Sequence, residues 1–319
     1  NMAGLEKNSG FKITLKLLRK LIKATIYGDL LQTVLHKNRA YEVNKGETKK
    51  VYNKWMKKCK ELLKTASTKE FNKSLYEIVN DFEKIELDTS IEKPKVGIVG
   101  EILIKYHPYG NNFAEEILEK EGAEVYMPEL MGFAKYALKN NPIKHELLKT
   151  SKMTSDIFEL GLDLLDKIDS TSVDMPKKDY EKALASSKKG YMKPCNINKL
   201  AEEVQEILST GNQTGEGWLL TAEIIEFMNE GIQNIICLQP FACLPNHIVG
   251  KGVIKTIRAK FPEANITPVD YDPGASETNQ TNRIKLLMTV AKDNLKANKK
   301  RNKILKEENI FVMDETRAL

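Results

Sequence analysis

A nine-residue loop carries side chains of the types that most often do chemistry. Residues 239–247 read QPFACLPNH, so a thiol (Cys243), a carboxamide (Asn246) and an imidazole (His247) lie close together in a segment with two prolines. The run before it, residues 235–238, is the most apolar strand-like segment of the chain, and a helical pattern follows. In an open parallel sheet, ligands bind where loops leave the carboxyl ends of strands. Because the prolines restrict the backbone, we expect a shaped loop that presents a site.

Cys243 is the most informative of these side chains. Its thiolate could act as a nucleophile activated by His247 or by the following helix, or it could bind a metal or cluster; inert packing is an equally open alternative. Cys237 falls inside the apolar run and Cys59 lies on an apolar helical stripe, where buried thiols are expected. With Cys195, the chain has 4 cysteines and no C-x-x-C pair. We therefore expect reduced thiols and no self-contained zinc or iron–sulfur site.

A second group of polar residues follows the first strand-like segment. Lys105, His107, Asn111 and Asn112 precede a predicted helix. Free backbone N–H groups at a helix start favour an anion, so this loop could bind a phosphate or carboxylate. Capping of the helix by Asn111 explains the pattern equally well.

Two further segments are weaker candidates. Glu216 stands between Gly215 and Gly217, but no strand precedes this segment, so it is no dinucleotide fingerprint and a turn is favoured over close approach to a ligand. Residues 270–277 hold three carboxylates that could bind a cation or serve in acid–base chemistry, but a turn with Ser276 as helix cap is favoured. The candidate metal ligand is Cys243, and the candidate substrate- or anion-binding residues are Lys105, His107, Asn111, Asn112, Glu216, Asn246, His247 and Ser276.

Apolar periodicity predicts the elements that position these loops. Helical patterns fill residues 1–90, including one at 11–35 interrupted at Gly28 and Asp29. Strand-like patterns cover 96–104, 123–127, 234–239 and 265–270, with helical patterns at 111–121, 246–260 and from 276 onward. Parallel connections are right-handed, so the first strand is expected beside the third at the centre of the sheet, with the polar loops along one edge.

The predicted fold class is therefore α/β, with a Rossmann-like parallel sheet of about four strands. We expect a helical segment at residues 1–90, then a Rossmann-like domain at 91–319 that contains a large helical insertion at 129–230.

Composition excludes several classes of protein. With 319 residues, 41% of them hydrophobic, the chain can bury a large core. No run reaches the roughly 18 to 20 apolar residues that span a bilayer, and residues 1–10 lack the apolar segment of a signal peptide, so we expect a cytoplasmic protein without a membrane partner. The net charge of +6 comes largely from residues 292–306, where no aromatics interleave, so a solvated helix is favoured over a nucleic-acid site.

Several motifs in one order carry a family resemblance. Residues 215–223 (GEGWLLTAE), residues 239–252 (QPFACLPNHIVGKG) and residues 270–276 (DYDPGAS) resemble the 2-hydroxyacyl-CoA dehydratase and activase-related family. Shorter matches extend the similarity over most of the chain, at residues 39–42, 100–101, 107–108 and 110–112. The sequence is most similar to the carboxyl-terminal, dehydratase-like region of the very large members that also contain ATPase activase modules.

The resemblance implies a dehydratase-like protein of anaerobic metabolism, with a low-potential iron–sulfur cluster held between Rossmann-like halves. An ATP-dependent activase would supply electrons, and the substrate would be an acyl-CoA-type molecule. Cys243 matches the carboxyl-terminal cluster cysteine. The family's amino-terminal half, with its additional cysteines, is absent, so the chain is expected to be a fragment that supplies one ligand and part of the active-site wall.

Two alternative functions stay open from the sequence. The first is a non-catalytic docking module that binds CoA or a nucleotide through Lys105, Asn111 and Asn112. The second is a cysteine-dependent hydrolase or transferase that uses Cys243 and His247.

Overall fold

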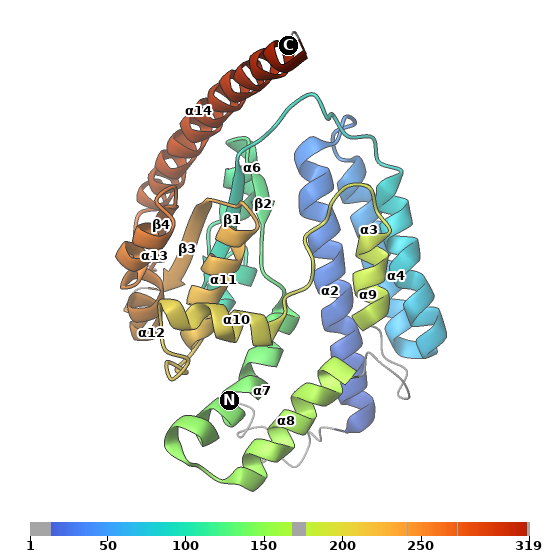
Figure 1. The fold of residues 1–319 in the computed structure, drawn as a ribbon. Helices are drawn as coiled ribbons and strands as arrows, with labels where there is room; N and C mark the ends of the chain where they lie inside the picture. Colours follow the sequence, from blue (N-terminus) through green and yellow to red (C-terminus); the bar gives the residue numbers. More distant parts are fainter. Residues whose placement is uncertain (1–13, 168–176, 241, 273, 318–319) are drawn as a thin grey trace. The chain divides into compact units, whose positions relative to one another are not determined.

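The protein folds into two compact units that interleave along the chain. The computed structural model describes residues 14–167, 177–240, 242–272 and 274–317 (Figure 1). One unit combines residues 1–89 with 128–199, and the other combines 90–127 with 200–319. The predicted insertion at 129–230 thus divides near residue 199, because its first part packs with the amino-terminal helices and its second part packs with the sheet.

The first unit is mainly helical in its described residues, with one isolated antiparallel bridge between Glu42 and Leu87. Its elements are α2 (Leu15–Tyr41), α3 (Glu47–Thr65), α4 (Thr68–Glu83), α7 (Leu130–Leu148), α8 (Lys152–Lys167) and α9 (Lys177–Ala185). Helix α2 runs unbroken through Gly28 and Asp29, so the predicted interruption there is wrong. Gly28 faces open space, and the Asp29 side chain bonds to another helix rather than to its own backbone.

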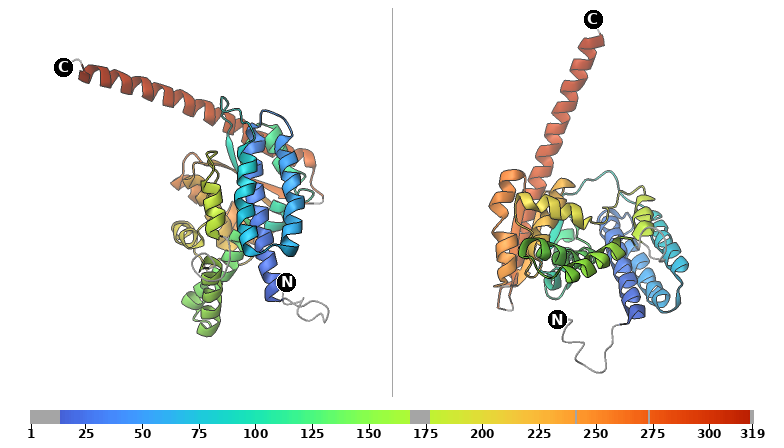
Figure 2. Two further views of the ribbon diagram at one scale, coloured as in Figure 1. Left: turned by 90° about the vertical axis from the view of Figure 1, so that its right-hand side faces the viewer. Right: turned by 60° about the horizontal axis from the view of Figure 1, so that its bottom comes forward.

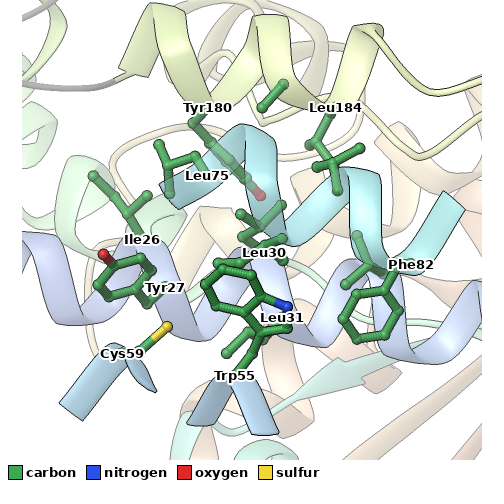
Figure 3. Packing of buried hydrophobic residues seen from close by; sticks show 14 of the residues in the cluster. Ile26, Tyr27, Leu30, Leu31, Trp55, Cys59, Leu75, Phe82, Tyr180 and Leu184 are labelled. Atoms are coloured by element: carbon green, nitrogen blue, oxygen red, sulfur yellow. The ribbon is translucent and has the colours of Figure 1, made fainter. Parts of the chain in front are cut away.

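Large side chains from α2, α3, α4 and α9 form the core of this unit. Trp55 of α3 and Phe82 of α4 are almost fully buried, and Leu75 of α4 and Tyr180 of α9 belong to the same cluster (Figure 3). Cys59 lies in the same core, as its place on an apolar stripe predicts.

The second unit is built on a four-stranded parallel sheet. The strands are β1 (Lys95–Gly100), β2 (Glu124–Tyr126), β3 (Asn234–Pro240) and β4 (Asn265–Tyr271), in the order β2-β1-β3-β4. The predicted placement of the first strand beside the third is confirmed. All strands run in one direction, so their carboxyl ends meet at one edge, which we call the carboxyl edge.

Helices cover both faces of this sheet. The helical elements are α5 (Ile102–Tyr106), α6 (Ala114–Lys120), α11 (Gly217–Asn229), α12 (Leu244–Asn246), η2 (His247–Lys251), α13 (Ile254–Lys260) and α14 (Glu277–Arg317), while α10 (Ile197–Glu203) and η1 (Val204–Glu206) precede α11. Helices α6 and α14 share a core with the sheet that includes Leu118, Ile284 and Met288. Beyond this contact α14 extends away from the sheet (Figure 2).

The first strand ends earlier than its apolar alternation predicts. Ile102 and Ile104 belong to α5, not to the strand. The chain turns at Gly100, where φ is +131° and a Cβ atom would lie 1.8 Å from the carbonyl oxygen of Leu238. Glu101 then starts α5, because its side chain accepts a hydrogen bond from the backbone N–H of Ile104 at 2.8 Å.

Candidate functional site

The carboxyl edge presents one accessible thiol among its described residues. Cys243 precedes α12, in the loop after β3, and is partly exposed. Cys237 is fully buried inside β3, and burial raises the pKa of its thiol to about 12. Cys59 and Cys195 are buried in the helical unit. Cys243 is therefore the cysteine best placed to react or to bind a metal.

Asn246 ties the Cys243 loop to two neighbouring loops. With the amide nitrogen facing the carboxylate, its Nδ2 donates to Glu216 Oε2 at 3.2 Å and its Oδ1 accepts from the backbone N–H of Glu101 at 3.2 Å. The other oxygen of Glu216 accepts from the backbone N–H of Ile102 at 3.0 Å. Both side chains are buried. Three loops that are remote in sequence thus share one hydrogen-bond network, which fixes the backbone beside Cys243.

This network gives a first testable prediction. Asn246→Ala leaves one buried carboxylate oxygen of Glu216 without its partner, so we expect a loss of about 1–3 kcal/mol in unfolding free energy. Faster amide hydrogen exchange at Ile102, whose N–H donates to the other oxygen of Glu216, should accompany the loss. Asn265→Ala is a matched control, because the Asn265 amide bonds away from the site, to Asn234 Oδ1 and to the carbonyl of Leu287. Unchanged stability together with unchanged exchange at Ile102 in Asn246→Ala would contradict the network.

Lys105 forms a buried ion pair. Its Nζ lies 2.9 and 3.0 Å from the two carboxylate oxygens of Glu223 on α11. The two side chains are only 5% and 6% exposed. Burial raises the pKa of Glu223, and the charge of Lys105 partly offsets that effect. The ammonium predicted to bind an anion is therefore turned inward and neutralised.

The other polar residues after β1 shape their own loop. His107 is exposed, and its Nδ1 accepts a hydrogen bond from the backbone N–H of Gly110 at 3.0 Å. Asn111 donates to the carbonyl of Ile104 at 2.8 Å and accepts from the N–H of Ala114 at 3.1 Å, which fits the capping interpretation. Asn112 Nδ2 donates to Gln280 Oε1 on α14 at 2.7 Å.

Of the carboxylates at residues 270–277, Asp270 lies within β4 and Asp272 in the turn that follows it. Asp270 accepts from Gln239 at 2.6 Å and from Lys251 at 2.9 and 3.0 Å. Burial works against ionisation of Asp270, but these two donors outweigh it and hold its pKa below the ordinary value. Asp272 closes a turn onto the N–H of Gly274 at 3.2 Å, and Ser276 is exposed just before α14. Within the described residues, no group of three or more His, Cys, Asp or Glu could hold a metal ion.

His247 begins a short π-helix, His247–Lys251, next to the Cys243 loop. Such segments often mark functional sites. Its backbone N–H donates to the carbonyl of Cys243 at 3.0 Å. Among the described contacts no hydrogen bond joins the His247 ring to the Cys243 thiol, so the paired geometry of a cysteine nucleophile is not formed.

Sequence reasoning missed several members of this edge. Gln239 on β3 and Lys251 in η2 both bond to Asp270 on β4, and sequence spacing does not reveal such pairs. Glu223 had a visible signal, because it is the one charged residue in the segment 217–225, GWLLTAEII. A charged residue in that position calls for a buried partner.

Comparisons with known proteins add no family: no family model matches the sequence, and no curated protein or solved structure matches it significantly. The fold is α/β with a parallel sheet. In the part of the chain that the structure describes, no helix is long and apolar enough to cross a membrane.

Proposed function

We propose that this chain is part of an iron–sulfur 2-hydroxyacyl-CoA dehydratase-like or reductase-like protein, in which Cys243 supplies one ligand of the cluster. The position of Cys243 carries this proposal. It is a partly exposed thiol on a hydrogen-bonded loop at the carboxyl edge of a parallel sheet, whereas the other three cysteines are buried. In the proposal, the loops after β1, β3 and β4 form part of the active-site wall.

The donor set fits one ligand and not a whole cluster. The described residues offer no metal-binding group of three or more, so the remaining thiolates must come from outside this chain. When bound, the cluster would supply low-potential electron transfer, fed by an ATP-dependent activase, to an acyl-CoA-type substrate. The chain's own part is to hold one thiolate in place through the Asn246 network and to line the cavity.

Two contacts disfavour the alternative of a CoA- or nucleotide-binding module. The ammonium of Lys105 is neutralised by Glu223, and that of Lys251 is paired with Asp270. The buried carboxylate of Glu216 adds negative charge to the same edge. A phosphate would find few unpaired cations here. Calorimetry with CoA and nucleotides checks this alternative directly, and we expect no binding to the chain.

Ligand exchange tests the proposed role of Cys243. A preformed cubane iron–sulfur cluster with small thiol ligands is mixed anaerobically with the 319-residue chain, and cluster absorption is followed through gel filtration. We expect the native chain to retain the cluster by exchanging one small thiol for Cys243. Cys243→Ser should lose most of that retention, because a serine hydroxyl ionises far less readily than a thiol.

Cys59→Ser and Cys195→Ser are the matched controls, since both remove a buried thiol and leave the edge intact. They should retain the cluster as the native chain does, and circular dichroism should confirm that all variants are folded. Equal retention by the native chain and by Cys243→Ser, or no retention by either, would reject the ligand assignment.

A further inference from the structure

An exposed apolar stripe runs along α8, in the unit that does not carry the site proposed above. Met153, Ile157 and Leu160 are 72%, 60% and 66% exposed, so water reaches most of each side chain. They are spaced by four and then three residues, which places them on one face of the helix. We call these three residues the α8 stripe. Large apolar side chains are usually buried, and a group of them that is exposed together marks an interaction surface.

Helix α8 packs against α7 through a different face. Ser155 is buried, and a Cβ atom added at Gly161 would lie 3.7 Å from Leu138 Cδ2 on α7. Neither residue has the spacing of the stripe, so the stripe is not what holds α8 against α7 (Figure 1). Leu147 and Leu148, at the end of α7, are also more than half exposed and add apolar surface to the same pair of helices.

The spacing of the stripe fits a helix as its occupant. Apolar residues that alternate at four and three residues form the narrow seam by which two helices pack side by side. A helix that faces a sheet or a core usually presents a wider apolar face. The partner surface that matches the stripe is therefore another helix with an apolar seam.

Charged side chains beside the stripe indicate which helix that is. Lys152, Asp156 and Glu159 are exposed, and each directly precedes a member of the stripe. Positive charge thus lies at the start of α8 and negative charge on its following turns. A parallel copy of α8 would bring like charges together, whereas an antiparallel copy brings Lys152 of each chain toward Glu159 of the other. The two acidic side chains would be repelled by an anionic membrane surface.

We propose that the α8 stripe is the contact between two copies of this chain, with the two α8 helices paired antiparallel. A two-fold axis brings the same surface of both copies together, so stripe meets stripe and one charge pair forms on each side of the axis. The contact surface is small, which gives a weak dimer with a Kd in the micromolar range. The proposal does not depend on the role of Cys243.

Light scattering after gel filtration of the 319-residue chain tests the dimer. A reducing agent is present, so that Cys243 cannot cross-link two chains. The average mass should rise with concentration from 36.2 kDa toward twice that value. Ile157→Asp should keep the mass of one chain over the same range, because it buries a charge at the centre of the seam.

Leu286→Asp is the matched control, since Leu286 is 65% exposed on α14 and lies outside the stripe. This variant should form the dimer as the native chain does, and circular dichroism should confirm that both variants are folded. A native chain that keeps the mass of one chain up to about 200 µM overturns the proposal. A dimer that persists in Ile157→Asp, or that is lost in Leu286→Asp, overturns it as well.

Exchange of the two charges tests the antiparallel orientation. Lys152→Glu and Glu159→Lys should each raise the Kd of the dimer by about threefold to tenfold, because each single variant places like charges opposite one another. The double variant should return the Kd close to the native value, since the same pairs form again with their signs exchanged. Both side chains are exposed, so the folded chain should tolerate the changes. Single variants without effect, or a double variant as weak as the singles, would overturn the pairing.

Discussion

Replacing Lys105 with methionine is expected to destabilise the sheet-containing unit by about 3–5 kcal/mol. The substitution keeps an unbranched side chain of nearly the same length but removes the ammonium that contacts both oxygens of Glu223. That carboxylate then lies buried without its partner, or must take up a proton. The measurement is urea unfolding followed by tryptophan fluorescence. Trp55→Phe is introduced into every variant, so that Trp218 on α11 alone reports this unit.

The double variant Lys105→Met/Glu223→Met separates loss of the charge pair from loss of shape. A buried ion pair can often be replaced by apolar side chains at little cost, so the double variant should recover most of the stability. Lys260→Met is the surface control, because the Lys260–Glu206 pair is 36% and 67% exposed and should contribute at most about 1 kcal/mol. A single Lys105 variant as stable as the native chain would show that Glu223 needs no buried partner.

The same ion pair shows why the sequence predicted the sheet and the edge that gathers the loops better than it predicted the contacts of individual side chains. The strand order and the edge that gathers the loops were predictable, because parallel connections have one handedness and apolar runs mark strands. The direction in which the Lys105 side chain points was not predictable. Apolar residues at 96–104 fit a strand, which would leave Lys105 in a loop, but α5 begins at Ile102 and turns that ammonium toward α11.

Tertiary pairs account for most of the remaining differences. Asn246 meets Glu216 and Glu101 only after three loops have been brought together, and spacing along the chain does not encode that meeting. A long-range contact also explains the unbroken helix at Asp29. The Gly28-Asp29 sequence indicated a break in α2, because aspartate side chains compete with the helix for nearby backbone groups. The Asp29 carboxylate instead accepts a hydrogen bond from the start of α7, 101 residues further along the chain, and so does not compete with the backbone of α2.

Gly100 gives the second large expected effect. Gly100→Ala should cost at least about 3 kcal/mol, because φ of +131° is a strained conformation for any residue with a side chain. The added methyl group would also lie 1.8 Å from the carbonyl oxygen of Leu238, a backbone atom that cannot rotate away. That carbonyl accepts the N–H of Glu101 at 2.9 Å, so the clash also disturbs the loop that starts α5.

Gly28→Ala is the matched control for this substitution. Gly28 lies inside α2 with nothing within 4 Å of the place that an added methyl group would occupy, so alanine there should stabilise the helical unit by up to about 1 kcal/mol. Urea unfolding of both variants gives the two free energies, and hydrogen exchange at Glu101 reports the local effect. The change in unfolding free energy is expected to have opposite signs at the two positions, although both substitutions add one methyl group. The backbone conformation and the nearest atoms at each position decide the sign. A Gly100 variant with native stability and native exchange at Glu101 would mean that β1 and α5 are joined by a different turn.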